Sequence, residues 1–114
     1  MKLHFDAVYY RVSDLDRAIC FYREVLGLQL VRRDVVACFD LDGVMLELVP
    51  DASIRQPRAG GNARLCFRVE DIRTARAELA DKDVPVGPVE EKSNGLLVTF
   101  CDPDGNEMSL WQYR

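Results

Sequence analysis

The 114-residue sequence has little of what builds a metal centre or a membrane anchor. It contains one histidine, His4, and its four cysteines form no Cys-x-x-Cys pair, which argues against zinc-finger and redox-pair sites. No segment approaches the run of about 20 apolar residues that a membrane span requires. The first residues include Lys2 and Asp6 but no apolar stretch with a small-residue cleavage site, so we expect a soluble, cytoplasmic protein with reduced thiols.

An excess of basic charge is also absent. The formal net charge is −4, and the basic clusters are short, such as Arg32-Arg33. Because nucleic-acid binding relies on basic surface to displace counterions, this composition argues against nucleic acid as a partner. The apolar fraction of 48% and the charged fraction of 30% are ordinary for a globular protein. A chain of this length buries roughly 65% of its unfolded surface and can fold as a single domain, 1–114.

The sequence does contain an internal repeat that spans most of its length. The tetrapeptide DLDG at 40–43 returns as DPDG at 102–105, and VSDL at 12–15 corresponds to VEDI at 69–72. Two half-size modules follow from this, the first over about 3–50 and the second over about 63–114. The proline-, glycine- and polar-rich stretch at 51–62 is the expected linker.

Each module is predicted to have β-α-β-β-β order. In the first, β-branched and aromatic runs predict strands at 7–12, 28–33, 35–41 and 44–49, and an S-x-x-D start with Gly27 as a stop predicts a helix over 14–26. In the second, strands are expected at 64–70, 84–89, 96–101 and 107–113, with a helix that begins after Asp71. The strand at 84–89 is expected at a sheet edge because Pro85 and Pro88 each remove a ladder donor. The fold class is α+β.

The segment VSDLDRAxxFYxxxLGL at 12–28, together with DPDGN at 102–106, resembles the vicinal oxygen chelate superfamily. That superfamily groups glyoxalase I, extradiol dioxygenases, fosfomycin-resistance enzymes and bleomycin-resistance proteins. The resemblance implies two β-α-β-β-β modules whose curled mixed sheets surround a cleft, with a homodimer completing it. In metal-dependent members the cleft holds a divalent ion bound by residues from four equivalent strands.

The repeat maps those four ligand positions onto this sequence. The two histidine positions of the family pattern fall on Ala7 and Arg64, and the two carboxylate positions fall on Glu47 and Ser109. Zinc enzymes use three protein ligands and iron dioxygenases use two histidines and a carboxylate, so one carboxylate does not build either site. We therefore expect no metal cofactor, although the resemblance leaves a divalent metal open. His4 has the opposite strand parity and is expected at the surface.

Strand alternation separates a core face from an open face. The core face holds Leu46, Leu48, Leu65, Phe67, Val69, Met108 and Leu110, and the candidate ligand-binding residues on the open face are Tyr9, Arg11, Glu47, Arg64, Cys66, Arg68, Ser109 and Trp111. Glu47 and Arg64 are interpreted as a structural ion pair in preference to a direct catalytic role for either residue, and this pairing is compatible with ligand binding on the same face. Together with Tyr9, Arg68 and Trp111, Arg64 can hold a small ligand with a planar ring or an anionic group. Cys66 is interpreted as a small apolar filler, with an activated thiolate as the alternative.

Two hypotheses about function follow. In the first, the chain is a metal-free binding module that holds a small molecule, a drug or a metabolite, in a cleft completed by a homodimer; which residues would be catalytic is left open. In the second, it is a metal-dependent lyase, isomerase or dioxygenase of the same superfamily with a remodelled active site. The four mapped positions favour the first hypothesis. The aspartates of the DLDG and DPDG segments are interpreted as turn formers and not as calcium ligands.

Overall fold

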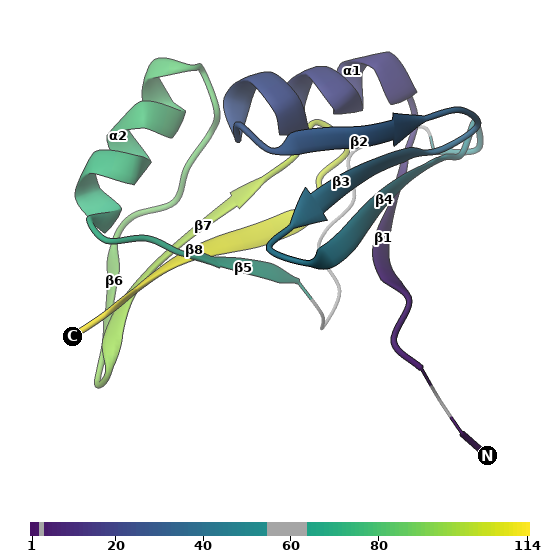
Figure 1. Ribbon diagram of the computed structural model, residues 1–114. Coiled ribbons are helices and arrows are strands. Elements are labelled where there is room, and N and C mark those ends of the chain that lie inside the picture. Colours follow the sequence, from purple (N-terminus) through teal and green to yellow (C-terminus); the bar gives the residue numbers. More distant parts are fainter. Residues whose placement is uncertain (3, 55–63) are drawn as a thin grey trace. The chain divides into compact units, whose positions relative to one another are not determined.

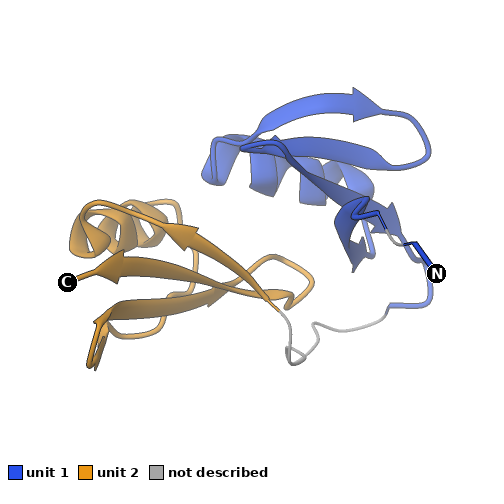
Figure 2. Cartoon of the chain, turned by 60° about the horizontal axis from the view of Figure 1, so that its bottom comes forward, with its two compact units in different colours: residues 1–56 blue, residues 57–114 orange. Residues whose placement is uncertain are grey.

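A computed structural model describes residues 1–2, 4–54 and 64–114 of the chain. The chain divides into two compact units, Met1–Gln56 and Pro57–Arg114, hereafter unit 1 and unit 2 (Figure 2). Of the predicted linker at 51–62, residues 55–62 lie outside the described part of the chain. Within the described part, no helix is long and apolar enough to cross a membrane.

Unit 1 is a four-stranded mixed sheet with one helical segment along one of its faces (Figure 1). Its elements are β1 Ala7–Val12, α1 Leu15–Cys20, η1 Phe21–Val25, β2 Gln29–Arg33, β3 Ala37–Leu41 and β4 Val44–Pro50. The strand order is β1-β4-β3-β2, with β1 parallel to β4 and the other pairs antiparallel. The first β-α-β-β-β module is therefore confirmed, with each predicted strand shifted by at most two residues.

The helical segment of unit 1 starts as an α-helix and ends as a π-helix. Asp14 caps it by accepting a hydrogen bond from Arg17 N at 3.0 Å, and Gly27 ends it with φ +71°. The predicted helix over 14–26 has the right extent, but its second half is wider than expected. The wider turn buries two consecutive aromatic residues, Phe21 and Tyr22, of which Tyr22 packs against Phe39 with ring centroids 5.9 Å apart.

Unit 2 repeats the plan with β5 Leu65–Arg68, α2 Ile72–Asp81, β6 Glu90–Lys92, β7 Gly95–Cys101 and β8 Glu107–Tyr113. The strand order is β5-β8-β7-β6, with β5 parallel to β8 (Figure 1). The side chain of Asp71 caps α2 by accepting hydrogen bonds from the backbone of Arg73 and Thr74. Two four-stranded mixed sheets, each with a helix on one face, confirm the α+β fold class.

The predicted strand at 84–89 is wrong in position. This segment meets β7 in an isolated bridge, Val86 to Phe100, in which Gly87 N donates to Thr99 O at 2.9 Å, and it continues into no regular ladder. The regular edge strand, β6, follows at Glu90–Lys92. Pro85 and Pro88 flank the bridge and offer no N–H to β7, so continuous pairing begins only after them.

The two copies of the repeated tetrapeptide form different turns. Between β3 and β4 the loop has two residues, Asp42 and Gly43, both with positive φ, as a tight hairpin of primed type requires. Leu41 of the first copy is the last residue of β3, whereas Pro103 at the same place in the second copy has no N–H to donate to a neighbouring strand. The strand therefore ends earlier, and the loop between β7 and β8 has five residues. The buried Asp102 fills the wider loop by accepting hydrogen bonds from Asp104 N at 2.9 Å and from Asn106 N at 2.8 Å. The aspartates are therefore turn formers, as expected.

Both sheets bury the face that their helix covers. Leu46, Leu48 and Met108 are fully buried and Leu110 is 6% exposed, as the alternation predicts. The predicted core residues of β5 and just beyond it, Leu65, Phe67 and Val69, are only half-buried, because β5 is an edge strand with one neighbour. The residues between them in sequence project from the opposite, uncovered face, which we call the open face of each unit.

Candidate functional site

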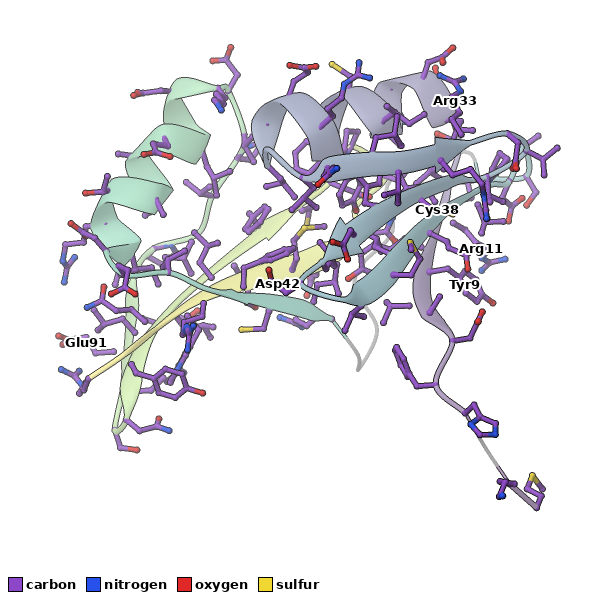
Figure 3. All side chains as sticks on the ribbon, viewed as in Figure 1. Tyr9, Arg11, Arg33, Cys38, Asp42 and Glu91 are labelled. Atoms are coloured by element: carbon purple, nitrogen blue, oxygen red, sulfur yellow. The ribbon has the colours of Figure 1, made fainter. Side chains whose placement is uncertain are left out.

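The open face of unit 1 carries three of the eight candidate residues. Tyr9 of β1 lies directly beside Glu47 of β4 in the parallel register, and Arg11 lies beside Val49. Leu46 and Leu48 point to the helix side, so Glu47 between them points to the open face. Tyr9 is 63% exposed (Figure 3).

The charged side chains of this face differ in whether they already have an ion-pair partner within unit 1. The Arg11 guanidinium forms an ion pair with Asp51, with 3.1 Å between Nη1 and Oδ2. The half-buried Glu47 carboxylate makes no hydrogen bond or ion pair with another described residue of unit 1. Burying a charge costs free energy unless it gains a partner, so Glu47 is the residue of unit 1 that a ligand would satisfy.

The open face of unit 2 carries the other five candidates. The parallel register sets Cys66 of β5 beside Ser109 of β8, and Arg68 beside Trp111. Arg64 directly precedes β5 and is exposed. Cys66 and Arg68 are exposed as well, whereas Ser109 is 4% exposed and Trp111 is half-buried. Among the described residues, Arg68 makes no side-chain ion pair or hydrogen bond.

Arg64 is held by an ion pair within unit 2. Its Nη2 lies 2.6 Å from Oε2 of Glu107, and the two side chains are 39% and 26% exposed. Glu107 stands beside Cys101 in the antiparallel β7–β8 register. Burial raises the pKa of Cys101, the charges of Glu107 and Asp102 raise it further, and Arg64 opposes them. The predicted pairing of Arg64 with Glu47 joins the two units and stays a prediction.

The surroundings of Cys66 disfavour its thiolate form. Burial raises its pKa above the ordinary value for cysteine, and no neighbouring cation offsets this among the causes of the shift. A raised pKa lowers the thiolate fraction, which is the reactive form. The raised pKa therefore argues against the activated thiolate, whereas the apolar-filler interpretation stays a prediction, because Cys66 is exposed on unit 2.

The end of the open face of unit 2 opposite Arg64 is aromatic. Trp111 meets Tyr113 edge to face with ring centroids 5.7 Å apart, and its indole lies over the backbone of Gly95. A Cβ on Gly95 would stand 2.7 Å from Trp111 Cε2 and 2.5 Å from Gln112 O, so only glycine leaves room for the ring. The face thus runs from the Arg64–Glu107 ion pair at one end of β8 to a fixed aromatic surface at the other.

The four mapped ligand positions do not suit a divalent ion. In unit 1, Ala7 has no donor atom and only Glu47 has one. In unit 2, Arg64 has no acceptor lone pair, and Ser109 offers a neutral hydroxyl in place of a carboxylate. Among the described residues, no group of three or more His, Cys, Asp and Glu side chains is placed to hold a metal ion.

Two residues of this face were not among the sequence-derived candidates. Glu107 lies two residues before Ser109 on the same face of β8, so alternation places it correctly, but its partner could not be read from the sequence. The sequence does not indicate the role of Gly95, because a glycine at the start of a strand is usually interpreted as a turn residue. Its role depends on the register that sets it beside Tyr113 and under the indole.

Comparison with known proteins agrees with this architecture. The family model "Glyoxalase/Bleomycin resistance protein/Dioxygenase superfamily" matches residues 4–110. The metallothiol transferase FosB of Bacillus licheniformis is 31% identical over 107 residues, which are 89% of this chain and 70% of that protein. A lactoylglutathione lyase from Agrobacterium tumefaciens superposes with a TM-score of 0.76 at 25% identity, covering 96% of this chain and 92% of the other. TnmS3, an antibiotic binding protein from Streptomyces sp. CB03234, gives a TM-score of 0.76 at 24% identity over 100% of both chains. The chain belongs to the glyoxalase/bleomycin resistance protein/dioxygenase superfamily.

Proposed function

We propose that this protein binds a small molecule, a drug or a metabolite, without a metal ion. In this proposal the two units act as one domain, the ligand occupies a cleft that a homodimer completes, and the protein is cytoplasmic. The observation that carries the proposal is the ion pair between Arg64 and Glu107, with 2.6 Å between Nη2 and Oε2. It puts a cation at a position where metal-dependent relatives are expected to keep a ligand.

The charge of Arg64 opposes a metal and favours an anion. Two like unit charges 4 Å apart repel by about 4 kcal/mol at an effective dielectric of about 20, and a dication doubles this. The Glu107 carboxylate, 2.6 Å from Arg64, offsets part of this repulsion. A guanidinium is always charged and presents planar donors that match a carboxylate or a phosphate. Arg68 adds a second guanidinium on the same face, with no ion pair or hydrogen bond to any other described residue.

The aromatic end of the same face suits the rest of such a ligand. Trp111 and Tyr113 meet edge to face, and Leu97 lies beside Trp111 across the β7–β8 register. Aromatic side chains supply large contact area to a planar ring at a low cost in side-chain entropy. A ring with an anionic substituent would lie along β8, with its ring near Trp111 and its charge toward the arginines.

The fold accommodates a binding role as well as catalysis. A Streptomyces protein that shares the fold is described as antibiotic binding, and the match to it extends over 100% of both chains. Fold alone does not assign a ligand, so this likeness supports only the class of function.

A thermal-shift screen in the presence of a chelator tests the proposal. Antibiotics, aromatic acids and thiol conjugates are added separately, and a compound that binds only the folded state raises the melting temperature by mass action. We expect a shift from a planar anionic compound with the metal removed. A flat response from every class, or shifts that disappear when the chelator is added, would overturn metal-independent binding.

Variants then locate the bound ligand. Arg64→Gln removes a charge-assisted hydrogen bond and is expected to cost about 1.5 kcal/mol of binding free energy, which is slightly more than tenfold in Kd. Arg64→Lys keeps the positive charge and should lose less binding free energy than Arg64→Gln. Arg73→Gln is the matched control, because Arg73 lies on α2 and not on the open face. An equal loss for Arg64→Gln and Arg73→Gln would remove Arg64 from the binding site.

The homodimer is tested separately by light scattering coupled to size exclusion. The proposal predicts twice the mass of the chain, and a monomer at every concentration would contradict a cleft shared between two chains.

A second candidate function is a metal-dependent lyase, isomerase or dioxygenase with a remodelled active site. The observation in its favour is the similarity to FosB, a metallothiol transferase by name, at 31% identity. Glu47 is the one mapped ligand position that retains a carboxylate, and no other described residue of unit 1 pairs with it. Glu47→Gln separates the two functions, because it would abolish metal binding in a metalloenzyme and leave the affinity for an anion at Arg64 unchanged.

A further inference from the structure

An irregularity in β2 changes which side chains reach the open face of unit 1. Leu30 pairs with Phe39, but the next pair is Arg32 with Cys38, so Val31 is an extra residue on β2. Such a bulge reverses the alternation for the residues after it. Without it Val31 would oppose Cys38 and Arg32 would point toward the helix. The bulge therefore directs Arg32 to the open face.

The redirected arginine completes a row of four side chains across the sheet. The registers set Tyr9 of β1 beside Glu47 of β4, Glu47 beside Cys38 of β3, and Cys38 beside Arg32 of β2. Neighbouring strands lie about 4.8 Å apart, so the row is continuous. The Arg32 side chain lies toward Cys38 in this row, because its Nη2 donates a hydrogen bond to Cys38 Sγ at 3.2 Å.

The row presents opposite charges on either side of a small apolar residue. Cys38 is 3% exposed and forms the floor between Glu47 and Arg32. The Arg32 side chain is 62% exposed and forms an ion pair with Asp34, with 3.5 Å between its Nε and Oδ2. A guanidinium has five N–H donors, so donors of Arg32 remain available to a ligand. Glu47 makes no hydrogen bond or ion pair with another described residue of unit 1.

We infer that this row binds an α-amino-acid head group, with its ammonium on Glu47 and its carboxylate on Arg32. The two charges of such a group are attached to a single carbon, so they match a cation and an anion that are separated by one small side chain. Tyr9, 63% exposed on the far side of Glu47, offers its ring to the ligand's side chain. This inference rests on the proposed function and specifies the ligand class for unit 1.

Three related compounds test it by NMR titration of the whole chain with chelator present. L-phenylalanine carries both charges, 3-phenylpropanoate carries the carboxylate alone, and 2-phenylethylamine carries the ammonium alone. We expect phenylalanine to shift amide signals of β2, β3 and β4 and to bind about tenfold more tightly than either analogue, as one extra charge-assisted hydrogen bond gives. No binding of phenylalanine, or equal affinity for the three compounds, would overturn the inference.

Variants assign each charge to its residue. Arg32→Gln should reduce the affinity for phenylalanine to that for 2-phenylethylamine, and Glu47→Gln should reduce it to that for 3-phenylpropanoate. Arg33→Gln is the matched control, because Arg33, the next residue of β2, points to the helix side (Figure 3) and forms an ion pair with Asp16 of α1. An equal loss for Arg33→Gln and Arg32→Gln would contradict the role of the bulge.

The outcomes separate this inference from the function on which it rests. If compounds from the thermal-shift screen bind without metal but phenylalanine does not bind, metal-independent binding stands and the amino-acid head group is refuted. If nothing binds in the screen and phenylalanine gives no shift, both fail. Shifts confined to unit 2 would refute the head-group site in unit 1.

Discussion

Replacement of Gly95 by alanine tests how the only tryptophan of the chain is held on the open face of unit 2. The added Cβ would stand 2.7 Å from Trp111 Cε2 and 2.5 Å from Gln112 O, both far inside van der Waals contact. The backbone of Gly95 is not left-handed, so alanine is acceptable there apart from this collision. The indole and the β8 backbone must therefore move.

The size of the effect follows from overpacking. Forcing extra atoms into a filled site costs about 1–3 kcal/mol. An unfolding entropy of about 2.1 cal/mol/K per residue gives about 240 cal/mol/K for this chain of 114 residues, so the melting temperature should fall by about 4–12 °C. Calorimetry measures the fall, and tryptophan fluorescence reports the displaced ring as a red-shifted emission maximum.

Gly87→Ala provides the control for the loss of a strand-side glycine. The nearest atom to its added Cβ is Thr99 O at 3.2 Å, a tight contact that a small shift relieves. We expect a smaller change in melting temperature and an unchanged emission maximum. If Gly95→Ala leaves both the melting temperature and the emission within error of the wild type, the indole does not lie where the structure puts it and the aromatic surface loses its basis.

Three further predictions concern the turns, a helix cap and a thiol. Asp102→Ala should cost about 2–4 kcal/mol of stability in urea unfolding, because it leaves one buried donor, Asp104 N, and the part-buried donors of Asn106 without their acceptor. Asp40→Ala removes one exposed hydrogen bond from Gly43 N and should cost under about 1 kcal/mol; equal losses would contradict the difference between the two turns. Asp71→Ala should lower the melting temperature at neutral pH and Asp71→Asn should lower it less. Because hydrogen bonds from Thr74 hold the pKa of Asp71 below its ordinary value, the deficit of the alanine variant should narrow as pH falls through that lowered pKa, and a deficit independent of pH would refute the role of the charge. Since burial raises the pKa of Cys66, its alkylation by iodoacetamide, followed by peptide mapping, should have a pH midpoint above that of the urea-unfolded chain, and a lower midpoint would indicate an activated thiolate.

The fold could be predicted from the sequence because, in each module, the helix-capping residues and the hydrophobic alternation of the strands indicate the same elements. The caps at Asp14 and Asp71 and the alternation that buries Leu46 and Leu48 act within one element, so they can be recognised without knowing the partner strand. The edge strand of the second module was wrong in position because the sequence shows that Pro85 and Pro88 weaken pairing but not where pairing resumes.

The details of the candidate site depend on contacts between elements, and these were less accessible. No proline or glycine in the sequence indicates the bulge in β2. Because of this bulge, Arg32 and not Val31 pairs with Cys38. The ion pair of Arg64 with Glu107 depends on the side-by-side packing of β5 and β8, which sequence alternation alone does not fix. Residue types at the four mapped positions could be read directly, and they gave the prediction that the site lacks a metal.

Metal analysis of the full chain, purified without chelator and equilibrated with zinc or manganese, decides whether the protein holds a divalent ion. We expect metal well below one ion per chain after removal of free ions, because Ala7, Arg64 and Ser109 supply no anionic or imidazole donor in addition to that of Glu47. One tightly held divalent ion per chain, lost on Glu47→Gln, would contradict it and establish a metalloprotein with a remodelled ligand set.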